Sequence, residues 1–255
     1  MRNRAQIKQE AKQLIRTGRV SPLVMTAILL VIGFMLERVI TYVEYGTLFT
    51  YGLDLQYIQA LYSGDLYEVG ALLSALPEAT VLSSFLSILV SLVTLILSAG
   101  YYVYCMGIRQ GVVMPYSTLF DGLSVAGKLI WCAVLMYIKV FLWSLLFVVP
   151  GIVAVYRYRF AYYNLLTDSS LSAGEAIRLS CQQTSGMKWE LFVLDLSFIG
   201  WSFLSALTMN ILSIWLQPYM TLCDLAYFED AQRSLGRSPY GGTDVPPHTD
   251  QPWEF

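Results

Sequence analysis

Between residues 81 and 108 the chain carries no charged side chain. A helix rises 1.5 Å per residue, so about 20 apolar residues are enough to cross the ~30 Å hydrocarbon core of a bilayer. A run that is longer than this and free of charge predicts a transmembrane helix. It makes a membrane protein the first hypothesis for the whole chain.

The composition supports the same class. Charged residues make up 13% of the 255 residues, roughly half the ~25% of soluble domains, and 56% of the residues are hydrophobic. A soluble globule needs a charged exterior, and this chain has too little charge to form one. With 16 basic against 18 acidic residues, it also lacks the positive charge by which nucleic-acid binders attract phosphates. These numbers exclude a nucleic-acid binder, a disordered protein and an ordinary soluble enzyme.

Further apolar stretches complete the predicted set of spans, at 23–43, 129–149, 151–166, 191–209 and 211–228. We expect the last two to turn around Asn210. The stretch 151–166 is the shortest, and Arg157 and Arg159 lie within it. Such a segment crosses at a thin place, re-enters the membrane or lies in the interface, and its length alone leaves these alternatives open.

The distribution of basic residues predicts the orientation. The first 21 residues hold six of them, Arg2, Arg4, Lys8, Lys12, Arg16 and Arg19, which places the N-terminus in the cytoplasm. If 151–166 crosses, the remaining basic loops and the tail also face inward, whereas otherwise Arg178 and Lys188 would lie outside. We therefore expect an all-α polytopic bundle of about six spans, with both termini cytoplasmic and with interfacial amphipathic helices.

The predicted domains are a basic amphipathic cytoplasmic helix at 1–21, a transmembrane domain at 22–228 and a disordered cytoplasmic tail at 229–255. One face of the first helix is apolar and is formed by Ile7, Ala11, Leu14 and Ile15. This pattern suits an anionic inner leaflet. An anchoring role is favoured over a lipid sensor, because the positive-inside rule already requires the charge.

Two other segments carry helix signals. Residues 66–76 place leucines at helical spacing in the acidic outer loop, which predicts a helix on the outer surface or a lid. Ser172 followed by Glu175 forms a capping box, and it predicts a helix at 173–185 that Gly186 ends.

The residues that usually carry chemistry are sparse. The four cysteines show no CxxC spacing, and the single histidine, His248, lies in the polar tail. No histidine triad, zinc helix or phosphate-binding glycine loop can be built from such a set. We therefore expect no catalytic residue, no metal and no cofactor.

Charged residues inside the predicted spans are the best candidates for a site: Lys139, Arg157, Arg159, Asp195 and Asp224. Ionisable groups are expensive in a bilayer and usually face a bundle interior or a water-filled cavity. Counting the helical rise from the cytoplasmic ends predicts that Arg157 or Arg159 pairs with Asp195 or Asp224. Lys139 lies near the midplane without an obvious partner. The same groups fit structural ion pairs, which we favour, or a transport site.

The segment 143–193 carries a resemblance. It contains Pro150 and Gly151 before an aromatic run, then Glu175, Arg178 and Ser180, and finally Gly186, Lys188 and Trp189. In this order the motif resembles the bacterial multi-pass membrane protein family called domain of unknown function 975, found mostly in Gram-positive organisms. A looser version is similar to the membrane domain of some glycerophosphodiester phosphodiesterases, whose catalytic domain has no counterpart here.

The resemblance implies a multi-pass plasma-membrane protein of a Gram-positive bacterium and no assigned activity. Together with the lack of catalytic groups, it favours a non-enzymatic scaffold, regulatory or accessory role. The expected partners are membrane lipids and, as a further candidate, another membrane protein. The alternative is a small transporter or channel subunit that uses the intramembrane charges.

Overall fold

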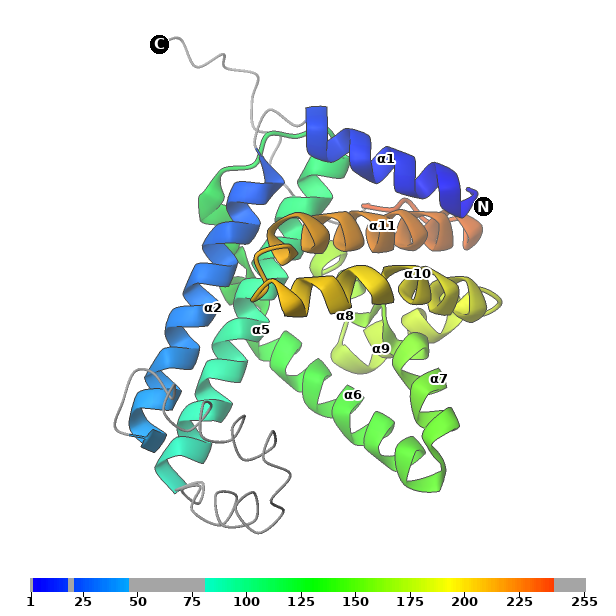
Figure 1. Ribbon diagram of the computed structural model, residues 1–255. Helices are drawn as coiled ribbons and strands as arrows, with labels where there is room; N and C mark the ends of the chain where they lie inside the picture. Colours follow the sequence, from blue (N-terminus) through cyan, green and yellow to red (C-terminus); the bar gives the residue numbers. More distant parts are fainter. Residues whose placement is uncertain (1, 18–20, 46–80, 241–255) are drawn as a thin grey trace, which may run out of the picture. The chain divides into compact units, whose positions relative to one another are not determined.

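In the computed structural model, which describes residues 2–17, 21–45 and 81–240, every regular element is a helix (Figure 1). This confirms the all-α class for the described ranges. The predicted helix at 66–76 and residues 241–255 of the predicted tail lie outside them. The chain divides into two compact units, Met1–Ile28 with Leu95–Phe255 and, separately, Leu29–Thr94. The first unit contains all the candidate site residues.

Four helical stretches are long and apolar enough to cross a membrane: Pro22–Val43, Leu82–Arg109, Tyr116–Leu146 and Lys188–Leu207. They correspond to helix α2 (Pro22–Tyr45), α5 (Val81–Arg109), η1 with α6 (Tyr116–Val125 and Ala126–Leu146) and α10 (Lys188–Leu207). Four of the predicted spans thus coincide with such helices, which supports a multi-span membrane protein.

The second unit consists, in its described part, of the adjoining portions of α2 and α5. Both portions carry large apolar side chains that are more than half exposed, among them Phe34, Met35, Leu82 and Phe85. Exposed apolar surface of this extent is costly in water and suits contact with lipid.

The predicted span 151–166 is not a continuous helix. It is divided into α7 (Val148–Tyr158) and α8 (Ala161–Thr167), with an interruption at Arg159 and Phe160. With 11 residues, α7 rises only about 16 Å, roughly half the hydrocarbon thickness. The preceding helix also ends earlier than expected, at Leu146, because Phe147 is extended at φ −162° and ψ 155°.

α6 and α7 pack as a hairpin around Phe147 (Figure 1). Pro150 lies in the first turn of α7, where its missing N–H removes no helical hydrogen bond. Gly151 lies directly against Ser144 of α6, and a Cβ at this position would overlap the serine side chain. The Pro-Gly pair therefore fits the first turn of α7 and lets this helix lie close to α6.

α11 (Ser213–Ser234) differs most from the predicted span 211–228. The turn before it passes through Met209 and Asn210 with positive φ, as expected around Asn210. The helix then continues to Ser234, beyond the predicted start of the tail at 229, and it is buried along most of its length. Figure 1 shows why, because α11 lies between α1 (Arg4–Thr17) and α10 and contacts both. Protein thus covers this helix on two sides.

α1 is amphipathic, but its apolar face does not lie free on a leaflet as predicted. Ile7, Ala11 and Ile15 are buried, and the helix packs along α11. Lys8 Nζ donates to Ser197 Oγ of α10 at 2.6 Å and lies 4.7 Å from the ring centre of Phe198. The helix is therefore an integral layer of the first unit.

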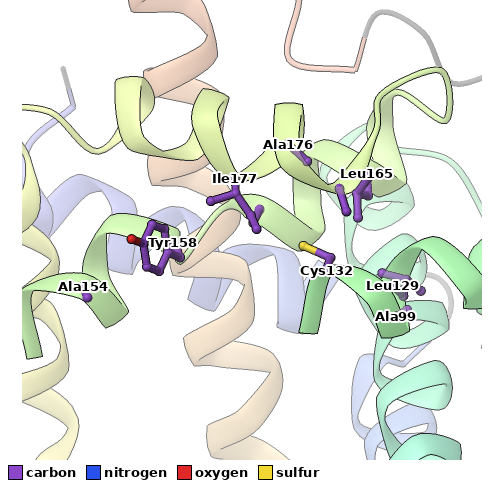
Figure 2. Close-up of a cluster of buried hydrophobic side chains, with 10 residues drawn as sticks. Ala99, Leu129, Cys132, Ala154, Tyr158, Leu165, Ala176 and Ile177 are labelled. Carbon is purple, nitrogen blue, oxygen red and sulfur yellow. The ribbon is translucent and has the colours of Figure 1, made fainter. Parts of the chain in front are cut away.

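A cluster of buried side chains joins the middle of the first unit (Figure 2). It gathers residues of α5 to α8 and of α9 (Ala173–Gln183), namely Ala99, Leu129, Cys132, Ala154, Tyr158, Ala161, Leu165, Ala173, Ala176 and Ile177. Half of these are alanines, and small side chains let helix backbones approach closely. The core thereby fixes the α7–α8 interruption against α6 and α9.

Candidate functional site

The interruption between α7 and α8 is held by hydroxyl groups from α9. Ser180 is fully buried; its Oγ donates to the carbonyl oxygen of Arg157 at 3.0 Å and accepts the backbone N–H of Phe160 at 3.1 Å. Thr184 Oγ1 also donates to the Arg157 carbonyl, at 3.3 Å. Backbone groups released by a helix break need such partners, so Ser180 stabilises both sides of the break.

Arg159 stands at this break and contacts two carboxylates. Its Nη1 and Nη2 lie 2.6 and 2.8 Å from the Asp195 oxygens, and Nη2 lies 2.8 and 2.9 Å from those of Asp224. Tyr156 Oη donates to Asp195 at 2.9 Å. We call these four residues the Arg159 cluster. It ties α7 to α10 and α11.

The Arg159 cluster is partly buried. The side chains of Arg159, Asp195 and Asp224 are 19%, 30% and 17% exposed. Hydrogen bonds between ions are roughly twice as strong as those between neutral groups, and the planar guanidinium suits paired carboxylate oxygens. One cation faces two carboxylates, so the cluster holds a surplus negative charge when both are ionised. Chemically, it is able to hold helices together or to accept a proton or a cation.

The other predicted intramembrane charges lie apart from this cluster. Arg157 contributes its carbonyl to the helix break, but its exposed guanidinium makes no hydrogen bond or ion pair with the residues that the structure describes. Lys139 Nζ lies 5.9 Å from the ring centre of Tyr158, a distance suited to a cation–π contact. The structure therefore brings together three of the five predicted charges.

The residues of the family-like motif lie in or between α7, α9 and α10, and none of them belongs to the Arg159 cluster. Glu175 completes the predicted capping box of α9, because its carboxylate accepts the Ser172 N–H at 2.9 Å while the serine caps the helix. Gly186, at φ +85°, turns the chain toward α10. Lys188 and Trp189 begin α10, and the tryptophan ring stacks on Phe192. Arg178 is exposed on α9.

A second group of charges was missed by the sequence reasoning. Arg109 Nη2 lies 2.7 Å from Glu229, while the backbone N–H and Nε of Arg2 each lie 2.9 Å from Asp230. Arg2 also binds Glu229 and Glu10. We call this set the terminal ion network. It joins α1, α5 and α11. In the sequence, only the continuation of helical periodicity past residue 228 indicated it.

Burial and pairing act in opposite directions on the acids of the terminal ion network. Burial alone would raise the pKa of Glu229, but the hydrogen bond and charge of Arg109 outweigh it and lower that pKa below its ordinary 4.5. Burial would likewise raise the pKa of Asp230, but the hydrogen bonds and the charge of Arg2 outweigh it and lower that pKa. Both acids are therefore ionised at neutral pH.

Part of the chain matches the model of a known protein family. Residues 145–234 match the model of a family described as Protein of unknown function (DUF975). No curated protein and no solved structure matches the chain. The matched segment runs from the end of α6 to the end of α11 and contains the complete Arg159 cluster. Within this segment the chain is similar to a family without an assigned activity.

Proposed function

We propose that the protein is a non-enzymatic integral protein of the plasma membrane, with a scaffold, regulatory or accessory role. The Arg159 cluster would then be a structural tie rather than a substrate site. The observation that carries this proposal is the engagement of Arg159 by four short contacts to carboxylate oxygens of two other helices. A guanidinium committed in this way is pre-organised to hold α7, α10 and α11 together.

The proposed topology keeps six crossings and cytoplasmic ends, in a Gram-positive cell as the resemblance implies. In it, the fourth crossing consists of α7 and α8, whose 11 and 7 residues rise together about 27 Å. A broken helix is tolerated at membrane depth when protein surrounds the irregular backbone. The hydroxyls of Ser180 and Thr184 provide such surroundings at the break.

Charge exchange tests the structural role. Arg159→Asp should sharply reduce the folded yield in membranes, because three carboxylates would then face one another. Combining it with Asp195→Arg or Asp224→Arg should restore part of that yield. Arg157→Ala is the matched control, since this neighbouring arginine makes no ion pair among the described residues, and its yield should stay normal. Failure of every combination to recover would contradict the proposal.

A second candidate is a small transporter or channel subunit. The observation that favours it is the surplus carboxylate, since two aspartates share a single arginine in a partly buried place, and intramembrane carboxylates serve as proton relays in transporters. Flux through proteoliposomes that disappears in Asp224→Asn at an unchanged folded yield would establish this alternative over the scaffold.

A further inference from the structure

A polar pocket lies where the end of α11 meets α8 and α9, outside the four candidate spans. Its volume is about 160 Å³, and its lining includes Asn164, Asp168, Gln232 and Arg237. An adjoining pocket of about 320 Å³ shares Arg237 and adds Arg178. Neither the Arg159 cluster nor the terminal ion network contributes to these linings.

The C-terminal cap of α11 places Arg237 over the pocket. Gly236 has φ +68°, its N–H donates to the carbonyl of Arg233, and the Arg237 N–H donates to that of Gln232, both at 3.0 Å. These two bonds form a Schellman motif, which needs the left-handed glycine and folds the chain back over the last turn. Arg237 is thereby held next to Gln232.

Buried amide side chains border the first of the two pockets, which we call the inner pocket; the adjoining one is the outer pocket. Asn164 and Gln183 exchange two hydrogen bonds of 2.8 Å, and Gln232 Nε2 lies 3.5 Å from Asn164 Oδ1. This arrangement fixes the amide of Gln232 with its nitrogen toward Asn164. Gln232 is only 5% exposed, yet its Oε1 is buried without a hydrogen-bond partner. Buried acceptors are nearly always paired, so this oxygen calls for a donor.

The two pockets differ in their charged side chains, because Asp168 lines only the first and Arg178 and Glu175 line only the second. Asp168 accepts both of its hydrogen bonds, from the N–H and hydroxyl of Ser170, on Oδ1, which leaves Oδ2 unengaged among the described residues. Arg178 and Arg237 make no side-chain hydrogen bond or ion pair within the described part of the chain. The inner pocket, of about 160 Å³, is thus lined by the Gln232 amide and the Asp168 carboxylate, with Arg237 at its edge. The outer pocket, of about 320 Å³, is lined by the guanidinium groups of Arg178 and Arg237 and by the Glu175 carboxylate, whose Oε2 is occupied by the N–H and hydroxyl of Ser172.

We propose that the two pockets together bind an aminoalkyl phosphate. Its ammonium group would face Asp168 and would donate to Gln232 Oε1 once a side-chain movement uncovers this buried oxygen. Its phosphate would lie between Arg178 and Arg237, because arginine matches phosphate oxygens in pairs. This chemistry occurs both in a soluble aminoalkyl phosphate and in an aminophospholipid head group. The proposal does not depend on the scaffold function.

Calorimetric titration of the full-length protein with phosphoethanolamine tests this site. The protein is held in phosphatidylcholine nanodiscs, which lack primary amines. We expect saturable binding, at least tenfold tighter than that of inorganic phosphate or ethanolamine alone. Gln232→Met, which keeps the shape but removes the acceptor, and Arg178→Ala should each weaken it about tenfold, the effect of one lost hydrogen bond to a charged group. Arg157→Ala, outside both linings, should leave it unchanged.

A second set of nanodiscs distinguishes the sources of the ligand. If phosphatidylethanolamine in the bilayer suppresses binding of free phosphoethanolamine, the lipid head group occupies the site; if it does not, the ligand is soluble. Either result supports the site when Arg178→Ala also weakens the binding of phosphoethanolamine in phosphatidylcholine nanodiscs. The proposal is overturned if phosphate alone binds as tightly, if neither variant weakens binding, or if no saturable binding occurs and the pocket holds only water. Arg178 is exposed on α9, so its variant keeps the test decisive even if Gln232→Met fails to fold.

Discussion

Arg159 serves two carboxylates at once because its guanidinium presents several N–H groups in one plane. Nη1 is directed to Asp195, and Nη2 is shared between Asp195 and Asp224. A lysine has the same charge but only a compact ammonium, which cannot reproduce this fork. The identity of the residue is therefore as important as its charge.

We expect Arg159→Lys to lower the free energy of unfolding by about 1–2 kcal/mol, because the paired geometry is lost while the charge remains. Arg159→Ala should cost more, approaching the ~3–5 kcal/mol of a broken buried pair, reduced by the partial exposure of the cluster. Thermal unfolding in detergent measures both. Equal stability of the lysine variant and the native protein would show that the fork geometry contributes nothing.

Ser180 provides the second prediction at the residue scale. Ser180→Ala would leave the Phe160 N–H without its acceptor and remove one donor from the Arg157 carbonyl. A buried group left unpaired costs about 1–3 kcal/mol, so the melting temperature should fall. Ser185→Ala is the control, because Ser185 is exposed just after the same helix. Similar melting temperatures for both variants would refute the capping role.

At the element scale, α7 approaches α6 closely at Gly151, where an added Cβ would overlap the Ser144 side chain. Gly151→Ala should separate the hairpin and destabilise the protein by about 1–3 kcal/mol, as overpacking does. Gly200→Ala in α10, where the added Cβ meets no atom within 4 Å, should instead be neutral or gain up to ~1 kcal/mol of helix propensity. Opposite signs for the two glycines, measured by thermal unfolding, distinguish packing from propensity.

The docking of α1 on α11 should depend on pH. The lowered pKa of Glu229 means that its ion pairs contribute full stability above its ordinary 4.5 and lose it as the pH falls through the lower value in the folded protein. Proteolysis of the N-terminal helix should therefore accelerate on acidification below about pH 4.5. Glu229→Gln should be cleaved rapidly already at neutral pH and change less with acid. A native cleavage rate that is constant from pH 7 to pH 3 would contradict this role.

The helices differ in how far the sequence predicted them. Four spans and the capping box at Ser172 follow from local patterns, and helical rise alone placed Arg159 near Asp195 and Asp224. The reversal between the predicted spans 129–149 and 151–166 was placed near residue 150 and not at Phe147, because the run from Leu145 to Val149 is apolar throughout and hydropathy does not mark a turn inside it. The terminal ion network was missed because Arg2 and Asp230 are distant in sequence, and an acidic helix end looks like the start of a tail.

At the scale of the whole chain, charge governs the orientation. The six basic residues in the first 21 and the lack of any in the loop at 44–80 favour a cytoplasmic N-terminus. The side of the membrane on which α9 lies depends on the segment 151–166, which is divided into α7 and α8. Only if this segment crosses the membrane do α9 and Arg178 return to the cytoplasmic side. If α7 instead re-entered, α9 and the pockets beside it would face outward.

Cysteine labelling in intact cells separates these topologies. In a background lacking the four native cysteines, Ser170→Cys should resist a membrane-impermeant maleimide until the cells are opened, whereas Ser63→Cys, in the predicted outer loop, should react at once. Ser170 is exposed just before α9, so resistance in intact cells reflects its side of the membrane rather than burial. Immediate labelling at Ser170 would reduce the crossings before it by one. It would also place the aminoalkyl phosphate pockets outside, where a soluble cytoplasmic ligand has no access.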